Sequence, residues 1–240
     1  MLRALRGATR TGPLKLGLSG QNSIKCVQKR ALWGTIKHII NPDLEVERTC
    51  LWKHHSGDGV AAAVDKWETF DDKALGGASE LVVESIEDNI GGGGGHLVIK
   101  GSLDLDEEKA EEMQVRGGYC AVKGICSDTV DLRDYEGLEM ELRSPHKELT
   151  FTMNMSTASL FDDDIYQVKM EIQPSTEWKT IEVPFSAFVL TSHGRIKEYQ
   201  RANDSLQVES IGFLFKTEDG TESPFALEIK QIDAMPSFDE

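Results

Sequence analysis

The sequence predicts an all-β protein of the jelly-roll-like β-sandwich type. Short runs such as residues 138–143 and 149–153 alternate apolar and polar side chains, which is the period of a strand with one buried face. Polar or glycine-containing turns separate these runs, and helical periodicity is scarce between residues 67 and 232. Many short strands joined by such turns are typical of two packed antiparallel sheets.

The expected strands cover most of the chain after its first quarter. They are residues 81–83, 96–103, 118–123, 138–143, 149–153, 166–170, 180–183, 210–215 and 225–232. The side chains expected on buried faces include Leu138, Met140, Leu142, Phe225, Leu227 and Ile229. Five consecutive glycines at residues 91–95 lack the Gly-Lys-Ser/Thr ending of a phosphate loop, so they are expected to form a hairpin loop.

The charge of the chain is divided unevenly. Eight of the 26 lysine and arginine residues lie within residues 1–40, which contain no aspartate or glutamate. The rest of the chain therefore holds 18 basic residues and all 41 acidic ones. A basic leader without acids, and without the apolar core of a secretory signal, is typical of a mitochondrial transit peptide. A nucleic-acid-binding arm is disfavoured, because so acidic a body repels phosphate.

Three segments are expected along the chain: a transit peptide at residues 1–35, a linker with a short helix at 36–64, and the β-sandwich domain at 65–236. The residues expected in that helix, or at its cap, are Asn41, Pro42, Leu44, Leu51 and Trp52. No run approaches the about 20 apolar residues that span a bilayer, so any membrane contact is expected to be peripheral.

Several acidic and histidine pairs could hold a metal, but each has a simpler interpretation. Asp71 with Asp72, and residues 162–164, could bind calcium through carboxylate oxygens, yet neither fits a known calcium loop and solvated acidic loops are expected. His54 and His55 lie near Asp58, but adjacent side chains on a helix point apart. The cysteines outside the leader, Cys50, Cys120 and Cys126, have no zinc-ligand spacing.

No sequence motif supplies a catalytic centre. The elbow of serine hydrolases, the histidine pair of zinc proteases and the glycine fingerprint of dinucleotide-binding folds are all missing from the sequence. The expectation is therefore a protein that is not an enzyme and has no catalytic, metal-binding or cofactor-binding residues to name.

Several glycines, prolines and aromatic residues could have either a structural role or a role in binding. Gly76 and Gly77 could approach a ligand, but a turn with positive φ is expected. Pro184 is expected at a strand end or sheet edge because it lacks a backbone donor. The aromatic residues expected in the core are Trp67, Trp178, Phe185 and Phe188; the two tryptophans could alternatively stack on a sugar ring.

Taken in order, a set of short motifs resembles the complex I intermediate-associated protein family, whose domain is a galactose-binding-like β-sandwich. The motifs cover residues 65–233 approximately. They are Trp67, Phe70-Asp71-Asp72, Gly76-Gly77-Ala78-Ser79, Gly101-Ser102-Leu103, Arg116-Gly117-Gly118-Tyr119, Asp131-Leu132, Tyr135, Gly137-Leu138, Trp178, Val183-Pro184-Phe185, Phe188, Gly194-Arg195, Ile211-Gly212-Phe213 and Phe225-Ala226-Leu227-Glu228-Ile229. Residues 221–224 depart from the glycine-rich turn that many members carry before the last motif.

The resemblance implies an interaction protein that assists assembly of mitochondrial respiratory Complex I (NADH:ubiquinone oxidoreductase). Its expected partners are membrane-arm assembly intermediates and other assembly factors, and nucleic acid is not among them. It also implies a location in the mitochondrial matrix, with peripheral attachment to the inner membrane through partners. The alternative on the same fold is a module that binds a carbohydrate or another small ligand, because fold alone does not fix function.

Overall fold

A computed structural model describes residues 49–53, 64–75, 77–87, 94–104, 118–158, 163–200, 207–217 and 223–236, all within the unit Val46–Glu240. His54, His55, Asp58, Gly76, Asp162 and the acidic stretch 105–117 lie outside the described residues. Among the described residues, no helix has the length and apolar character needed to cross a bilayer.

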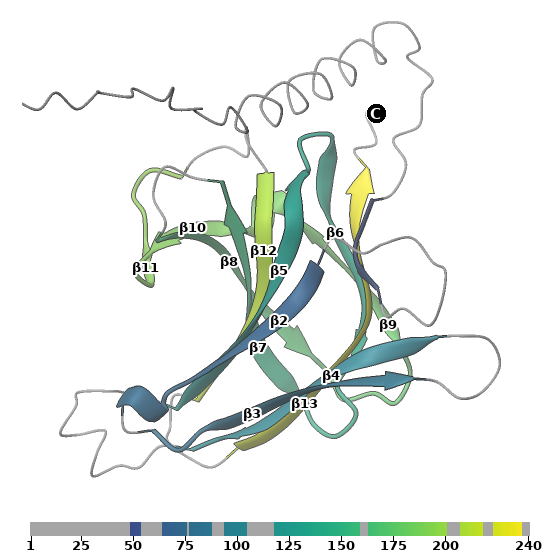
Figure 1. Ribbon diagram of the computed structural model, residues 1–240, viewed down its shortest axis with the longest axis vertical. Helices are drawn as coiled ribbons and strands as arrows, with labels where there is room; N and C mark the ends of the chain where they lie inside the picture. Colours follow the sequence, from purple (N-terminus) through teal and green to yellow (C-terminus); the bar gives the residue numbers. More distant parts are fainter. Residues whose placement is uncertain are drawn as a thin grey trace, which may run out of the picture. The chain divides into compact units, whose positions relative to one another are not determined.

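Two antiparallel sheets form the described part of the chain, and Figure 1 shows them facing each other. The strands of the first, sheet A, are β1 (Thr49–Lys53), β3 (Glu80–Glu87), β4 (Gly95–Leu103), β6 (Tyr135–Arg143), β9 (Lys179–Pro184) and β13 (Ser223–Pro236). Their order is β3-β4-β13-β6-β9, and β1 also pairs with β13. This arrangement makes β13 the central strand of sheet A.

Sheet B is the seven-stranded partner of sheet A. Its strands are β2 (Val64–Asp71), β5 (Tyr119–Asp131), β7 (Leu149–Thr157), β8 (Asp164–Ile172), β10 (Val189–Ser192), β11 (Arg195–Ile196) and β12 (Gln207–Lys216). Their order is β11-β10-β8-β7-β12-β5-β2. Two short 3-10 helices, η1 (Lys73–Leu75) and η2 (Phe185–Ala187), follow β2 and β9. The all-β sandwich expected from the alternating pattern is confirmed.

The core lies between the inner faces of the two sheets. The fully buried side chains include Leu138, Met140, Leu142, Phe151, Met153, Met155, Phe213, Phe215, Leu227 and Ile229. Aromatic contacts join the layers: the rings of Phe215 in sheet B and Phe225 in sheet A stack with centroids 4.2 Å apart. Trp52 of sheet A meets Trp67 of sheet B edge-on at 6.0 Å. The buried faces expected for the strands at 138–143 and 225–232 are therefore correct.

One expected element is wrong where the structure describes it, while residues 1–48, with the expected transit peptide and the helix start at Asn41 and Pro42, lie outside the described residues. Leu51 and Trp52 were expected on one side of a helix, but Thr49–Lys53 is strand β1, paired antiparallel with residues 231–234 of β13. Leu51 and Trp52 are both buried there, because the strand lies on the core and its backbone hydrogen-bonds to β13. Tertiary pairing thus overrides the local helical signals.

Other local expectations are met. The strands β3 and β4 pair antiparallel from Glu80↔Ser102 to Glu87↔Gly95, so Gly94 precedes β4 and Gly95 begins it, while residues 88–93 lie outside the described residues. Pro184 ends β9 at the edge of sheet A. Phe185 and Phe188 are buried in the core.

A buried carboxylate at one end of the sandwich joins the sheets. Asp72, just after β2, is 1% exposed and accepts hydrogen bonds from Ser79 Oγ (2.8 Å), Ser79 N (3.1 Å) and Tyr119 N (2.8 Å). A Cβ at Gly77 would lie 2.0 Å from the Asp72 carboxyl carbon, and Gly76, the other residue of the expected turn, lies outside the described residues. Gly77 is needed for close approach of a side chain.

Candidate functional site: the concave face of sheet B

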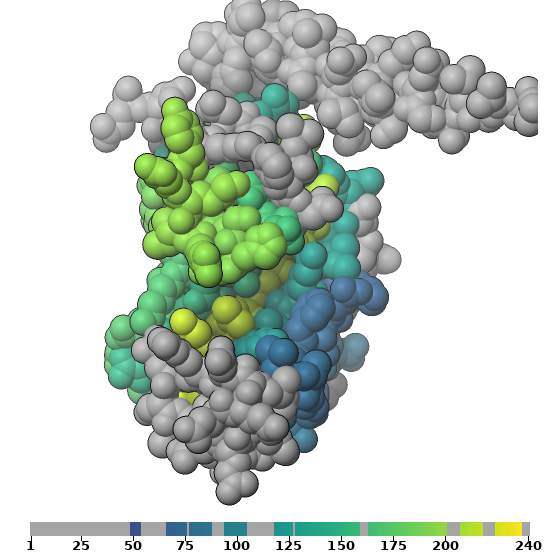
Figure 2. Space-filling view, turned by 90° about the vertical axis from the view of Figure 1, so that its left-hand side faces the viewer, coloured from purple at the N-terminus to yellow at the C-terminus, as the bar shows by residue number. Residues whose placement is uncertain are grey.

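The outer face of sheet B is concave and opens to the left in Figure 1. Its outward side chains form cross-strand rows that the pairing register fixes. The two central rows are Glu68, Lys123, Gly212, Asn154, Gln167 and Val189, and Phe70, Ala121, Leu214, Thr152 and Lys169. Figure 2 looks onto this face: the block formed by β10 and β11 (light green) stands out from it, and the surface below, over β12, is recessed.

The floor of this face is made of small and polar side chains on β12 and β7. At Gly212 a Cβ would lie 2.6 Å from the Val122 carbonyl oxygen, so the close approach of β5 excludes a side chain. Beside it, Gln167 Nε2 donates to Asn154 Oδ1 (2.8 Å), and Thr191 Oγ1 donates to Gln167 Oε1 (3.0 Å). This ladder fixes amide and hydroxyl groups across three strands, which gives the floor ordered polar groups.

The two outer faces differ in charge. The outward positions of sheet B hold Lys66, Lys123, Lys169 and Lys216 against Glu68 and Glu171. Lys66 pairs with Glu68 at 2.6 Å, Lys123 lies opposite the same glutamate, and Lys169 lies near Glu171 on β8. The outward positions of sheet A hold Glu80, Glu84, Glu139, Glu141, Glu182 and Glu228 against Lys100, Arg143 and Lys230. In a chain of net charge −15, the concave face is therefore locally basic.

A hairpin of β10 and β11 forms one rim of the concave face. Its two-residue turn, His193 and Gly194, has φ of 50° and 72°, the left-handed values that a tight hairpin requires. Its apolar side chains are the most exposed large ones described: Ile196 is 74% exposed and Tyr199, just after β11, is 85% exposed. Val189 of β10 is also exposed, on the same face as Ile196.

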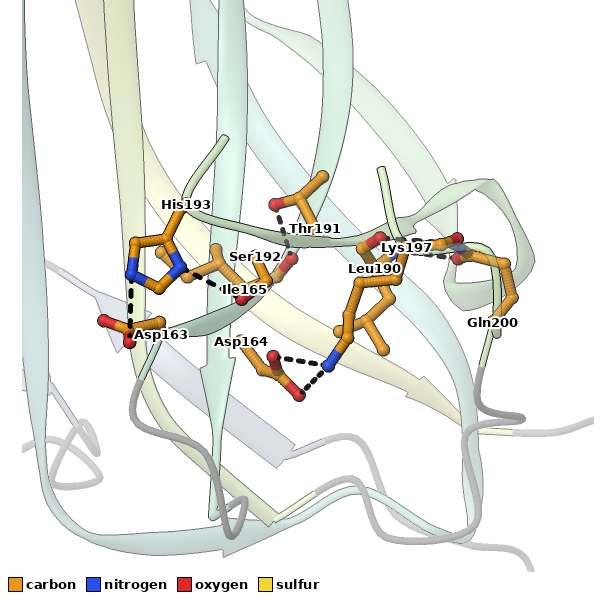
Figure 3. Close-up of polar contacts among 9 residues, drawn as sticks. All are labelled: Asp163, Asp164, Ile165, Leu190, Thr191, Ser192, His193, Lys197 and Gln200. Carbon is orange, nitrogen blue, oxygen red and sulfur yellow. Dashed lines mark hydrogen bonds and ion pairs between the residues drawn. The ribbon is translucent and has the colours of Figure 1, made fainter. Parts of the chain in front are cut away.

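Buried polar contacts fix this hairpin to β8 (Figure 3). Lys197 Nζ donates to both carboxylate oxygens of Asp164, at 2.8 and 2.9 Å, and Asp164 is almost fully buried. The Gln200 side chain accepts from Leu190 N (2.7 Å) and donates to Leu190 O (3.1 Å). The rim therefore has a defined position although its tip is exposed.

The hairpin turn brings together three side chains of the types found in serine hydrolases. His193 Nε2 lies 3.3 Å from Asp163 Oδ2, and His193 Nδ1 lies 3.3 Å from Ser192 Oγ. A hydrolase triad uses the opposite nitrogens, with Nδ1 toward the acid and Nε2 toward the serine. His193 and Asp163 are also 74% and 64% exposed, so no dry pocket surrounds them. The arrangement is that of an exposed surface contact, which sequence reasoning did not single out.

A second hollow, of about 600 Å³, lies at the η2 end of the sandwich. Its lining residues are Arg133, Tyr135, Glu136, Glu182, Pro184, Phe185, Ser186 and Met235. The Arg133 guanidinium is hydrogen-bonded to Asp131, which lowers the pKa of that carboxyl. Tyr135 shares a hydrogen bond with Thr49 at the start of β1. These contacts hold Arg133 against the end of β5 and join β6 to β1 within sheet A.

The two tryptophans proposed as sugar platforms have different surroundings. Trp67 packs inward, stacked on Phe213 with centroids 6.2 Å apart, as expected for a core residue. Trp178 does not lie in the core: the Arg143 guanidinium lies 4.3 Å from its ring centroid, and His96 meets it edge-on at 5.3 Å on the outer side of sheet A. On the ring face that Arg143 covers, a sugar would have to displace this guanidinium, which also bonds Glu228.

The acidic and cysteine residues considered for metal binding are separated or already paired. Among the described residues, no three of His, Cys, Asp and Glu gather in a metal-binding group. Asp71 pairs with Lys73, and Asp164 pairs with Lys197. Among the described residues, Cys50, Cys120 and Cys126 are not in disulfides. Burial raises the pKa of Cys120 to about 12 and that of Cys50 to about 11, with nearby Asp72 and Asp233 adding to the respective effects.

A family model described as Complex I intermediate-associated protein 30 matches residues 55–229. The chain belongs to this family. The motifs that resembled it are now assigned structural roles: Asp72, Gly77, Ser79 and Tyr119 form the corner between the sheets, and Gly212 forms the floor of the concave face.

Relatives that carry the same name with the word mitochondrial come from two animals and a fungus. The protein of Mus musculus is 24% identical over 212 residues, which is 82% of this chain and 61% of that protein. The protein of Drosophila melanogaster is 31% identical over 107 residues, or 43% of this chain and 36% of that protein. The matched regions therefore span less than two thirds of these relatives.

Solved structures with the same fold are carbohydrate-binding modules. The family 11 module of the cellulase Lic26A-Cel5E of Clostridium thermocellum has a TM-score of 0.54 and 16% identity, covering 82% of this chain and 99% of the module. The same type of module in complex with a mixed-linked tetrasaccharide has a TM-score of 0.52 and 14% identity, covering 78% and 96%. At this identity the likeness establishes the β-sandwich fold alone.

Proposed function

We propose that this protein is a non-catalytic assembly factor for mitochondrial respiratory Complex I, and that it binds and stabilises membrane-arm assembly intermediates. The single observation that carries the proposal is the family match over residues 55–229, which includes almost every described strand. The basic, acid-free residues 1–40 support import into mitochondria. We place the mature protein in the matrix, attached to the inner membrane through its partners.

The surface chemistry is compatible with transient binding. An assembly factor binds an incomplete complex and is released from the finished one, so its contacts are expected to be moderate in area and partly polar. The concave face of sheet B combines ordered polar groups, exposed lysines and an exposed apolar rim. Like-charged copies of so acidic a chain also repel one another, which favours a soluble monomer over self-association.

The test is depletion of the protein followed by native gel separation of respiratory complexes. Mature Complex I should fall and an intermediate containing its membrane arm should accumulate, while the other respiratory complexes stay near normal. Re-expression of the full chain should restore Complex I. Normal Complex I and normal intermediates after complete loss would contradict the proposal.

Import is tested separately. A reporter fused after residues 1–35 should enter isolated mitochondria and be shortened there, whereas a version with its arginines and lysines changed to glutamine should remain outside. Entry of both reporters to the same extent would contradict the import proposal without touching the binding proposal.

A further inference from the structure

The concave face of sheet B has no assigned ligand, and the positions of its lysines indicate what kind of molecule could bind there. Lys123 on β5 and Lys169 on β8 stand on either side of the small-residue floor, three strand spacings, or about 14 Å, apart across the sheet and in neighbouring cross-strand rows. Lys216 adds a third exposed positive charge at the end of β12. The spacing leaves room for one polypeptide segment between these two lysines.

The shape of the face favours a protein segment over a membrane or a nucleic acid. Ser210 and Gly212 on β12 are buried, and the block of β10 and β11 stands out beside this part of the face in Figure 2, so a flat bilayer cannot reach the floor polar groups. A long nucleic acid would extend past this face, and its phosphates would be repelled by the rest of a chain with net charge −15. A short acidic segment would place few of its charges outside the face, so this repulsion would be small. Apolar side chains of the same segment could contact Ile196 and Tyr199 at the rim.

We infer that the concave face of sheet B is the docking surface for an acidic segment of a protein partner, with apolar contacts at the β10–β11 rim. The inference rests on the proposed function and adds the surface and the chemistry of the partner. Carboxylates of the partner pair with Lys123, Lys169 and Lys216, and backbone groups of the partner bond to the Asn154–Gln167 ladder. Asp164 and Lys197 hold the rim in place for this contact.

The decisive comparison uses two variants of the full chain with the same change in net charge. The face variant carries Lys123→Gln, Lys169→Gln and Lys216→Gln. The control variant carries Lys53→Gln, Lys100→Gln and Lys230→Gln, three lysines that lie on sheet A and not on the concave face. Circular dichroism and thermal unfolding establish that both variants fold, since exposed lysines contribute little to stability.

The first measurement is fluorescence anisotropy with a labelled synthetic peptide of glutamate, serine and leucine. The wild type and the control variant should bind this peptide equally, and the face variant about tenfold more weakly, because three exposed charge pairs are lost. A counterpart peptide with lysine in place of glutamate should not bind. Equal affinity of the face and control variants would overturn the inference. Vesicles of phosphatidylcholine and phosphatidylserine that bind the wild type but not the face variant would also overturn it, in favour of a membrane surface.

The second measurement places a photo-crosslinking amino acid at position 169, or at position 100 as the control, in mitochondria that lack the native protein. Peptide mapping should locate the crosslinks from position 169 in acidic stretches of Complex I assembly components, with none from position 100. The control variant should restore Complex I and the face variant should not. If the face variant restores Complex I to the wild-type level, this inference is overturned and the assembly proposal stays intact. If loss of the protein and re-expression of the wild type leave the level of Complex I unchanged, the assembly proposal itself is overturned.

Discussion

Ser79 donates two hydrogen bonds to the carboxylate of Asp72, one from its backbone nitrogen at 3.1 Å and one from its hydroxyl at 2.8 Å. The two residues belong to different sheets, since Asp72 follows β2 of sheet B and Ser79 precedes β3 of sheet A. The Ser79 hydroxyl also accepts a hydrogen bond from Asp104 N at 3.1 Å, after β4. One buried carboxylate therefore fixes the ends of several strands from both sheets.

Removal of this carboxylate should destabilise the fold. Asp72→Ala leaves the donors of Ser79 and Tyr119 buried without their acceptor, so we expect a loss of about 2–4 kcal/mol in the free energy of unfolding. Urea unfolding followed by circular dichroism measures the change. Asp128→Ala is the matched control, because Asp128 is exposed, and it should change stability by less than about 0.5 kcal/mol. Equal effects of the two substitutions would show that the corner is not structural.

The central strand of sheet A supplies a second test. Leu227 is fully buried, so Leu227→Ala should cost about 2–5 kcal/mol through lost burial and the cavity left behind. Val82, on the outer side of β3 and 48% exposed, provides the control, and Val82→Ala should cost less than about 1 kcal/mol. A loss below about 0.5 kcal/mol for Leu227→Ala would contradict the inward assignment of this side chain.

Arg143 should not be replaceable by lysine. Two of its nitrogens lie 2.6 Å from Glu228 Oε2, a third donates to the Thr176 carbonyl at 2.7 Å, and its plane covers Trp178. A lysine ammonium cannot make all of these contacts, so Arg143→Lys should lose about 1–2 kcal/mol and increase quenching of tryptophan fluorescence by acrylamide.

Arg133→Lys is the control for this substitution. Arg133 also bonds a carboxylate, that of Asp131, but both side chains are about two fifths exposed, so the loss should be under about 0.5 kcal/mol. Comparable losses at positions 143 and 133 would show that the Trp178 cluster adds nothing beyond an ordinary surface pair.

Alkaline pH should weaken the fold partly through Cys120. Burial, together with Asp72 and Asp71, raises the pKa of this thiol from 9.0 to about 12, so the folded state keeps its proton where the unfolded chain loses it. The stabilisation is complete below pH 9.0 and is lost as the pH rises toward about 12. Between about pH 9 and 10.5 we expect about 1–2 kcal/mol less stability from this group. In urea unfolding across this range, Cys120→Ala should decline less steeply than the wild type; identical slopes would contradict the assignment.

The sequence by itself determined the sandwich. Alternation at residues 138–143 and 225–232 identifies the buried faces, because a strand places every second side chain on the same side whatever its neighbours are. The charge asymmetry of residues 1–40 and the ordered family motifs are likewise properties of the linear chain. Each of these predictions depends on near neighbours in sequence, which is why they could be made without coordinates.

Only the tertiary structure decided the corner and the candidate face. Asp72 and Tyr119 are 47 positions apart, and no local pattern distinguishes a buried carboxylate from the solvated acidic loop that was expected. Lys123 and Lys169 come from strands separated in sequence, and they share a face only because β12 and β7 lie between them. Strand β1 was missed for the same reason, since pairing with β13 holds it and its own residues do not specify it. The order of the strands in each sheet brings these side chains together. That order depends on pairing between segments far apart in the chain, which cannot be derived from local sequence patterns.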